Sequence, residues 1–118
     1  MGKMMKKFFK LNWVEADQEQ LDPKLSQRVF TTNNVMVVHY VYEPGLEFEK
    51  HSHPQEQVTI VQTGRLLIRV EDENVELRKG DICFIAPNIQ HSTTVLGDER
   101  VESISIFSPV AERVVIDR

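Results

Sequence analysis

Disulfides and long apolar stretches are both missing from this 118-residue chain. Its only cysteine, Cys83, cannot form an internal disulfide, which fits a reducing compartment, and its apolar neighbours place it in the core. No apolar stretch approaches the roughly 18 residues needed to cross a bilayer. Residues 1–13 also lack the uncharged centre of a secretory signal. The sequence predicts a cytoplasmic protein that does not enter a membrane.

Clustered positive charge is also scarce. The net charge is -4, and the only basic run, Lys3 with Lys6, Lys7 and Lys10, lies at the very start of the chain. A nucleic-acid-binding surface needs grouped lysine and arginine, so nucleic acid is not an expected partner. Hydrophobic residues at 41% are ordinary for a soluble domain, and the length fits one domain spanning residues 1–118.

The chain beyond residue 34 has the pattern of many short strands. Runs rich in valine, isoleucine, threonine and aromatics end at glycine, proline, asparagine or aspartate, and no helical period is present. The expected strands cover residues 35–42, 57–63, 66–70, 75–78, 82–86, 91–96 and 101–107. Seven strands at this spacing predict an all-β fold, either a sandwich or a small closed barrel.

The beginning of the chain is less regular. We divide it into an N-terminal arm over residues 1–25, a barrel core over 26–108 and a C-terminal tail over 109–118. The arm opens with the apolar residues Phe8, Phe9, Leu11 and Trp13. Because an open sheet edge needs protection, the arm is expected to cover an edge of its own barrel or to pair with a second chain.

Three histidines and a glutamine form the candidate metal site. His51 and His53 stand two apart in an extended segment, so both side chains leave the same face. Gln57 can return to that pocket on the next strand, although a bulge after Pro54 would bring Glu56 there instead. With His91 from another hairpin, this set suits one divalent first-row metal, namely Zn, Ni, Mn, Fe, Co or Cu, with open positions for water or substrate.

His39 is the fourth histidine, and it shares a strand face with Val37 and Val41. Alternation alone does not tell which face looks inward, so we expect a packed residue or one lining a substrate pocket. Tyr40 and Tyr42 lie on the other face of the same strand. We interpret them as core or dimer contacts.

The spacing of glycines around these ligands resembles the two motifs of the cupin superfamily. In the first, Gly45 precedes His51 by five intervening residues, and Gln57 precedes Gly64 by six. The second begins at Gly80 and ends in the stretch 86–91 (APNIQH). The resemblance implies a cupin β-barrel, or jelly roll, with a metal site, and single-domain cupins are similar in commonly forming homodimers.

The chain departs from the general motifs at several positions. Gln57 stands where many cupins have a ligand glutamate, Ala86 and Asn88 replace a proline and a glycine, and Val95 replaces a common asparagine. The glutamine has a chemical consequence. A neutral amide leaves the full charge of the metal uncompensated, which favours an anionic ligand or a developing oxyanion.

The sequence is most similar to the small pectin-degradation cupins. This resemblance implies a metal-assisted opening of unsaturated uronates to linear keto acids, with Phe107 kept in the substrate pocket. The family aspartate and arginine correspond to Ser105 and Ala111, so the catalytic acid and base remain unassigned. Arg113, two residues beyond Ala111, and Glu102, near the other end of the strand, are nearby but out of register.

Three functions follow as hypotheses. The first is a metal-dependent isomerase or ring-opening enzyme acting on an acidic sugar or keto acid. The second is a metal-dependent dioxygenase, because three histidine ligands leave room for dioxygen and a chelating substrate. The third is a binding module that holds a small acidic molecule without turnover.

Overall fold

The computed structural model describes residues 7–110, which form ten strands and one short 3-10 helix. These elements are η1 (Trp13–Glu15), β1 (Glu19–Asp22), β2 (Leu25–Thr31), β3 (Met36–Tyr42), β4 (Glu47–His51), β5 (Glu56–Thr63), β6 (Arg65–Val70), β7 (Glu73–Leu77), β8 (Ile82–Ile85), β9 (His91–Leu96) and β10 (Val101–Ser108). No helix in that range is long and apolar enough to span a membrane.

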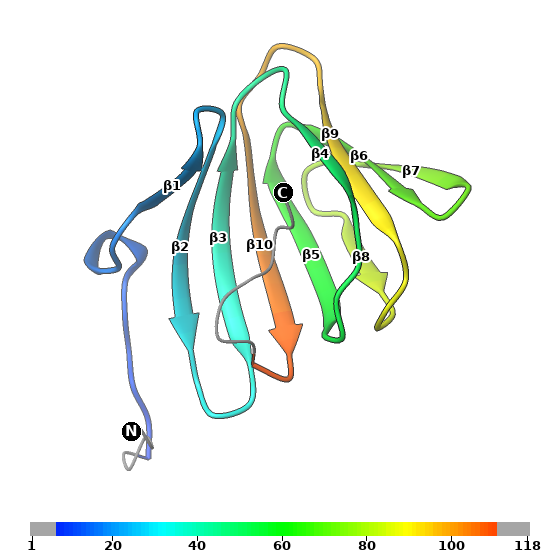
Figure 1. Cartoon of the computed structure of the whole chain (residues 1–118). Coiled ribbons are helices and arrows are strands. Elements are labelled where there is room, and N and C mark those ends of the chain that lie inside the picture. The colour runs from blue at the N-terminus through cyan, green and yellow to red at the C-terminus, as the bar shows by residue number, and fades with distance from the viewer. Residues whose placement is uncertain (1–6, 111–118) are drawn as a thin grey trace.

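The strands form two antiparallel sheets that face each other (Figure 1). The larger sheet has the order β1-β2-β3-β10-β5-β8, and the smaller has the order β4-β9-β6-β7. Neighbours such as β3 and β10 are far apart in sequence, so the sheets are closed by crossing connections. This arrangement confirms the predicted all-β jelly roll.

The core lies between the two sheets. Leu25, Val38 and Val61 of the larger sheet and Leu66 and Ile68 of the smaller are at most 2% exposed. Apolar side chains from both inner faces interdigitate there, and this burial is the main force that holds the sheets together. Cys83 packs against this core, as expected.

Strand β10 shows which face of the larger sheet looks inward. Its burial alternates strictly, and the inward residues include Ser103 and Ser105, both 0% exposed, while Ile104 and Ile106 point outward. The polar face is buried because it finds partners there: Ser103 Oγ lies 3.0 Å from the Tyr42 hydroxyl. The outer face of this sheet therefore carries isoleucines.

The expected arm does not stay separate from the sheet. Its described part, residues 7–25, contains η1, β1 and the first residue of β2, and β1 pairs with β2 as an edge strand. Leu25, at the expected boundary, is completely buried. Residues 1–6 of the arm and 111–118 of the tail lie outside the described range.

Candidate metal centre

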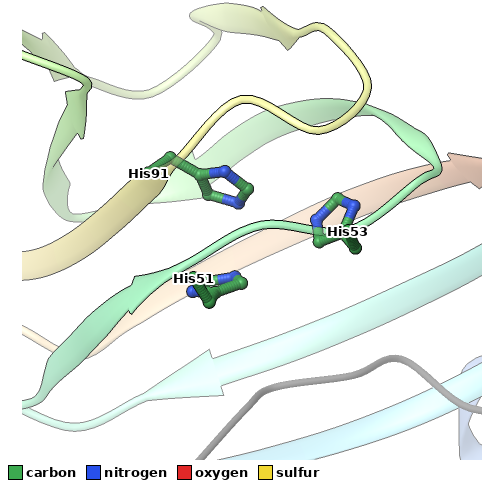
Figure 2. Close-up of side chains that lie close together, drawn as sticks. All are labelled: His51, His53 and His91. Carbon is green, nitrogen blue, oxygen red and sulfur yellow. The ribbon is translucent and has the colours of Figure 1, made fainter.

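Two adjacent strands bring the histidines to one end of the barrel. His51 ends β4 and is paired directly with His91, the first residue of β9, while His53 follows in the loop before β5. Figure 2 shows the three rings turned toward a common space. Residues paired directly in an antiparallel ladder share a face, so the register itself brings His51 and His91 together.

A β-bulge in β4 makes this register possible. Phe48 pairs with Thr93 and His51 pairs with His91, so three steps along β4 match two along β9. Without the additional residue, Lys50 would stand opposite His91, and His51 would point to the other face. The bulge thus turns His51 inward, which is a common use of bulges beside functional sites.

The three histidines lie within coordinating reach of a single ion. One ligand nitrogen from each falls within 4.8 Å of the others. The ring centroids of His51 and His91 are 4.3 Å apart, and that of His53 is 5.1 Å from His91. His53 and His91 are only 6% and 2% exposed. This is close packing for three groups that would repel each other if protonated.

Local hydrogen bonds fix which nitrogen of each ring carries the proton. In every case Nδ1 lies 2.9 Å from a backbone carbonyl two residues away: Glu49 for His51, Gln55 for His53 and Ile89 for His91. A carbonyl oxygen only accepts, so Nδ1 must donate. In the neutral ring the lone pair is then on Nε2, which is the arrangement that metal-binding histidines use.

His91 is held in its neutral form. Its pKa is lowered to about 4, chiefly by burial and also by the neighbouring His51 and His53, although the bond to the Ile89 carbonyl acts in the opposite direction. Its Nε2 is buried without a hydrogen-bond partner among the described residues. A buried, unprotonated and unpartnered nitrogen is unfavourable unless a ligand or ion satisfies it.

The amide of Gln57 has a defined orientation. Its Nε2 donates to Thr59 Oγ1 at 2.9 Å, and Thr59 Oγ1 lies 2.9 Å from Ser105 Oγ. The amide oxygen therefore faces His53, with Oε1 3.1 Å from Nε2. With Nδ1 of His53 already donating to Gln55, two acceptors face each other across this distance. A cation that both atoms can bind resolves that conflict.

Together these side chains fit the expected metal. Three unprotonated imidazole nitrogens and one amide oxygen form a neutral donor set of the kind that first-row divalent ions accept. Glu56, the alternative oxygen donor, is exposed on the other face of β5, whereas Gln57 lines the pocket. The structure thus brings together all four residues that the sequence singled out for the metal.

The pocket around these residues is mostly aromatic. Besides the four candidate ligands it is lined by Tyr40, Tyr42, Phe48, Thr93 and Phe107. Its space of about 30 Å³ suits an ion with one or two waters. Phe107 meets the His53 ring edge to face at 5.5 Å, so the structure places this expected pocket residue beside a candidate ligand.

The two tyrosines are buried in the core, as one of the two expected roles required, and they also line this pocket. Burial raises the pKa of Tyr42 to about 12, and burial together with Tyr42 raises that of Tyr40 well above its ordinary value. Both therefore keep their protons at neutral pH. Their place in the pocket follows from which face of β3 points inward, and the alternation in the sequence does not tell which face that is.

His39, expected either as a packed residue or as one lining a substrate pocket, lies outside the pocket that holds the candidate ligands. It points to the outer face of β3, where Nε2 lies 3.0 Å from Glu102 Oε1 and the Trp13 ring packs at 5.5 Å. The physical reason is the alternation of β3: Val38 and Tyr40 take inward positions, so His39 between them must face out.

Different residues stand where the pectin-degradation cupins have an aspartate and an arginine, and the structure describes some of them. Ser105 is fully buried on β10 and supports Thr59, so it acts behind Gln57 rather than at the pocket surface. Glu102 is occupied with His39 on the outer face. Ala111 and Arg113 lie outside the described residues. No carboxylate, lysine or arginine lines the pocket within residues 7–110.

Thr59 offers a test of the amide orientation. We expect Thr59→Val to weaken metal binding by about 10–100-fold, because removing the hydroxyl frees the amide to turn its NH₂ toward the site. Valine preserves the shape and the strand preference of threonine. The measurement is metal affinity by competition with a chelator.

The matched control is Thr94→Val, which makes the same change on the outward-facing position of β9 next to Thr93. Equal affinities for the Thr59 and Thr94 variants would show that the hydrogen-bond chain does not orient Gln57.

Comparisons with known proteins agree with this architecture. Residues 38–107 match the family described as the cupin domain. KdgF from Halomonas sp. has a TM-score of 0.81 with 23% identity, covering 91% of this chain and 97% of that one. An RmlC-like cupin from Shewanella frigidimarina has a TM-score of 0.79, also with 23% identity, covering 91% and 95%.

A third structure, a predicted oxalate decarboxylase from Thermotoga maritima, has a TM-score of 0.77 with 14% identity, covering 86% of this chain and 100% of that one. At these identities the likeness shows the fold alone. No match was found among curated proteins. The family match covers more than half of the 118 residues, and the chain belongs to the cupin domain family.

Proposed function

We propose that this cupin holds one divalent first-row metal at His51, His53, His91 and Gln57 and uses it to bind a small acidic molecule, such as a uronate or keto acid. One observation carries the proposal: each histidine donates Nδ1–H to a nearby backbone carbonyl, which puts the lone pair of the neutral ring on Nε2, and one ligand nitrogen from each ring lies within 4.8 Å of the others. The carbonyls serve as the outer partners that orient metal-binding imidazoles.

The charge of the site favours an acidic ligand. The four donors are neutral, and the described pocket lining contains no carboxylate that would compete with the substrate. A divalent ion held by these four residues would supply an uncompensated positive charge that would bind a carboxylate and polarise an adjacent carbonyl. A ligand entering the pocket would meet side chains of Tyr40, Tyr42 and Phe107.

The favoured activity is isomerisation of such a molecule, with opening of an unsaturated uronate as the specific reaction. Both tyrosines keep their protons at neutral pH, and Tyr40, whose hydroxyl is not engaged with Ser103 as that of Tyr42 is, is the candidate donor of a hydrogen bond to a developing oxyanion. The described pocket holds no carboxylate for general acid–base catalysis, a group that contributes about 10²–10⁴ in rate. We therefore expect turnover slower than that of a relative that retains this carboxylate.

Oxygen chemistry is the second candidate, and the same missing carboxylate favours it. A dioxygenase needs open positions beside a chelating substrate rather than a titrating side chain, and three histidine ligands can provide them. Zinc in the purified protein would argue against this activity, since zinc does not change oxidation state.

The deciding experiment follows a 4,5-unsaturated uronate by proton NMR in the presence of metal-reconstituted protein. Metal-dependent ring opening that is lost in His91→Ala and kept in His39→Ala supports the isomerase. His39 is the matched control because it is the histidine that lies outside the site. Oxygen uptake with an iron-loaded protein, without ring opening, would overturn the isomerase in favour of the dioxygenase. Saturable uronate binding without either reaction would leave a binding module.

A further inference from the structure

A second polar cavity lies on the outer face of the larger sheet, toward the edge formed by β1 (Figure 1). Directly paired residues of β2 and β3 share a face of this sheet. Arg28 is paired with His39, which faces outward, and two residues along the ladder Ser26 is paired with Val41. These side chains therefore lie together on the outer face. The complete lining of the cavity is Gln18, Ser26, Gln27, Arg28, His39 and Val41.

Arg28 brings a positive charge to this cavity without a partner for it. Its Nε is buried and has no hydrogen-bond acceptor among the described residues. None of the ion pairs formed within residues 7–110 includes this guanidinium. Arginine stays charged in proteins, and a buried N–H group of a charged side chain is costly to leave without an acceptor. A negatively charged acceptor would satisfy both the N–H group and the charge.

The carboxylates of the surrounding strands have other partners. Glu102 lies 3.0 Å from the ring of His39. Gln27 is paired with the inward-facing Tyr40, so its side chain lies on the other face of the sheet, where its Nε2 donates to Glu19 at 2.7 Å. No aspartate or glutamate lines the cavity within the described part of the chain. The lining thus contains a permanent positive charge and no negative one.

The size and the donors of the cavity fit a small oxyanion. Its volume of about 50 Å³ is room for roughly three or four atoms of water size, which matches a carboxylate or phosphate group and is too small for a sugar ring. A guanidinium presents two parallel N–H groups that match two oxygens of such an anion. Ser26, only 6% exposed, adds a hydroxyl that can donate a further hydrogen bond.

We infer that Arg28 and Ser26 form a binding site for a small oxyanion, either the carboxylate group of an organic acid or a phosphate. The site needs no metal, because the candidate metal ligands lie on the inner side of the sheet and none of them lines this cavity. The inference therefore goes beyond the proposed metal function and does not depend on it.

NMR titration of the isotope-labelled, metal-free full chain tests the inference. Sodium phosphate and sodium acetate are added separately at an ionic strength held constant with sodium chloride. We expect a saturable shift of the Arg28 Nε–H signal and of the Ser26 backbone amide, which chloride alone does not produce. Saturation with phosphate only or with acetate only would identify which oxyanion the site accepts.

Three variants locate the binding. Arg28→Gln should weaken the affinity read from the Ser26 amide by about 10–100-fold, because it removes hydrogen bonds from a charged donor. The matched control is Arg100→Gln, which removes an exposed arginine that pairs with Glu43 and should leave the affinity unchanged. His53→Ala should also leave it unchanged, which separates this site from the proposed metal centre.

Several outcomes would overturn the inference. No saturable shift with either anion would show that the cavity holds only water. Equal affinity in Arg28→Gln and the wild type would place the anion elsewhere. If the glutamine variant does not fold, Arg28→Lys replaces it, because lysine keeps the charge and lacks the two parallel N–H groups. Undiminished binding by that variant would equally reject the guanidinium as the ligand group.

Discussion

Replacing His53 with alanine should abolish stoichiometric metal binding. His53 is 6% exposed, contacts both other candidate ligand histidines and faces the amide oxygen of Gln57, so its loss removes a nitrogen that the remaining residues cannot replace. We expect affinity to fall by more than the roughly 10–100-fold typical of changes behind the ligands. Metal content after dialysis and calorimetric titration would measure it.

Two companion variants make this result interpretable. Gln57→Ala should weaken binding less than His53→Ala, because three imidazole donors remain. His39→Ala should leave stoichiometry unchanged, since that ring contacts Trp13 and Glu102 on the outer face. Full retention of metal by the His53 variant would reject the assigned site.

Gly64→Ala should destabilise the protein far more than Gly80→Ala. Both glycines adopt positive φ, +77° and +88°, so each alanine bears a conformational cost of roughly 1–2 kcal/mol. Only at Gly64 does the added Cβ also meet neighbours, at 2.6 Å from Val101 Cγ2 and 2.9 Å from the Arg100 carbonyl oxygen. Overpacking of this kind adds about 1–3 kcal/mol.

Urea unfolding of the metal-free protein would compare the two variants. The Gly80 position is the natural control because nothing lies within 4 Å of its added Cβ. Equal losses of unfolding free energy would mean that the loop carrying Gly64 relaxes away from Val101 and that close packing at this turn is unimportant.

The sequence predicted the fold well where strands alternate and end at turn residues. The seven expected strands correspond to β3 and β5 through β10, with bounds that shift by a few residues at most. Strand β4 was not recognised as a strand because its charged residues and its bulge interrupt the alternation. β1 and β2 were missed because they lie in the irregular opening of the chain or next to it.

The candidate ligands could be predicted because their identities and spacing are chemically specific. The alternation of residue types did not reveal which face of each strand points into the core. For β10 the buried face is the serine face, since Ser103 and Ser105 find hydroxyl partners inside, and for β3 it is the tyrosine face. Both outcomes depend on side chains contributed by distant strands, which a single strand pattern does not contain.

The tautomer of each candidate histidine is set by a carbonyl two residues away in the chain. The convergence of the three rings instead depends on the pairing of β4 with β9, in which His51 lies opposite His91, forty residues later. Local sequence thus determines which nitrogen of each ring carries the proton, and the tertiary fold determines where the rings meet. The carbonyl partners of His51 and His53 lie in their own segment, whereas the third ring is brought in only by the pairing of β4 with β9. We therefore expect the affinity of the proposed site for a metal to depend on completed folding.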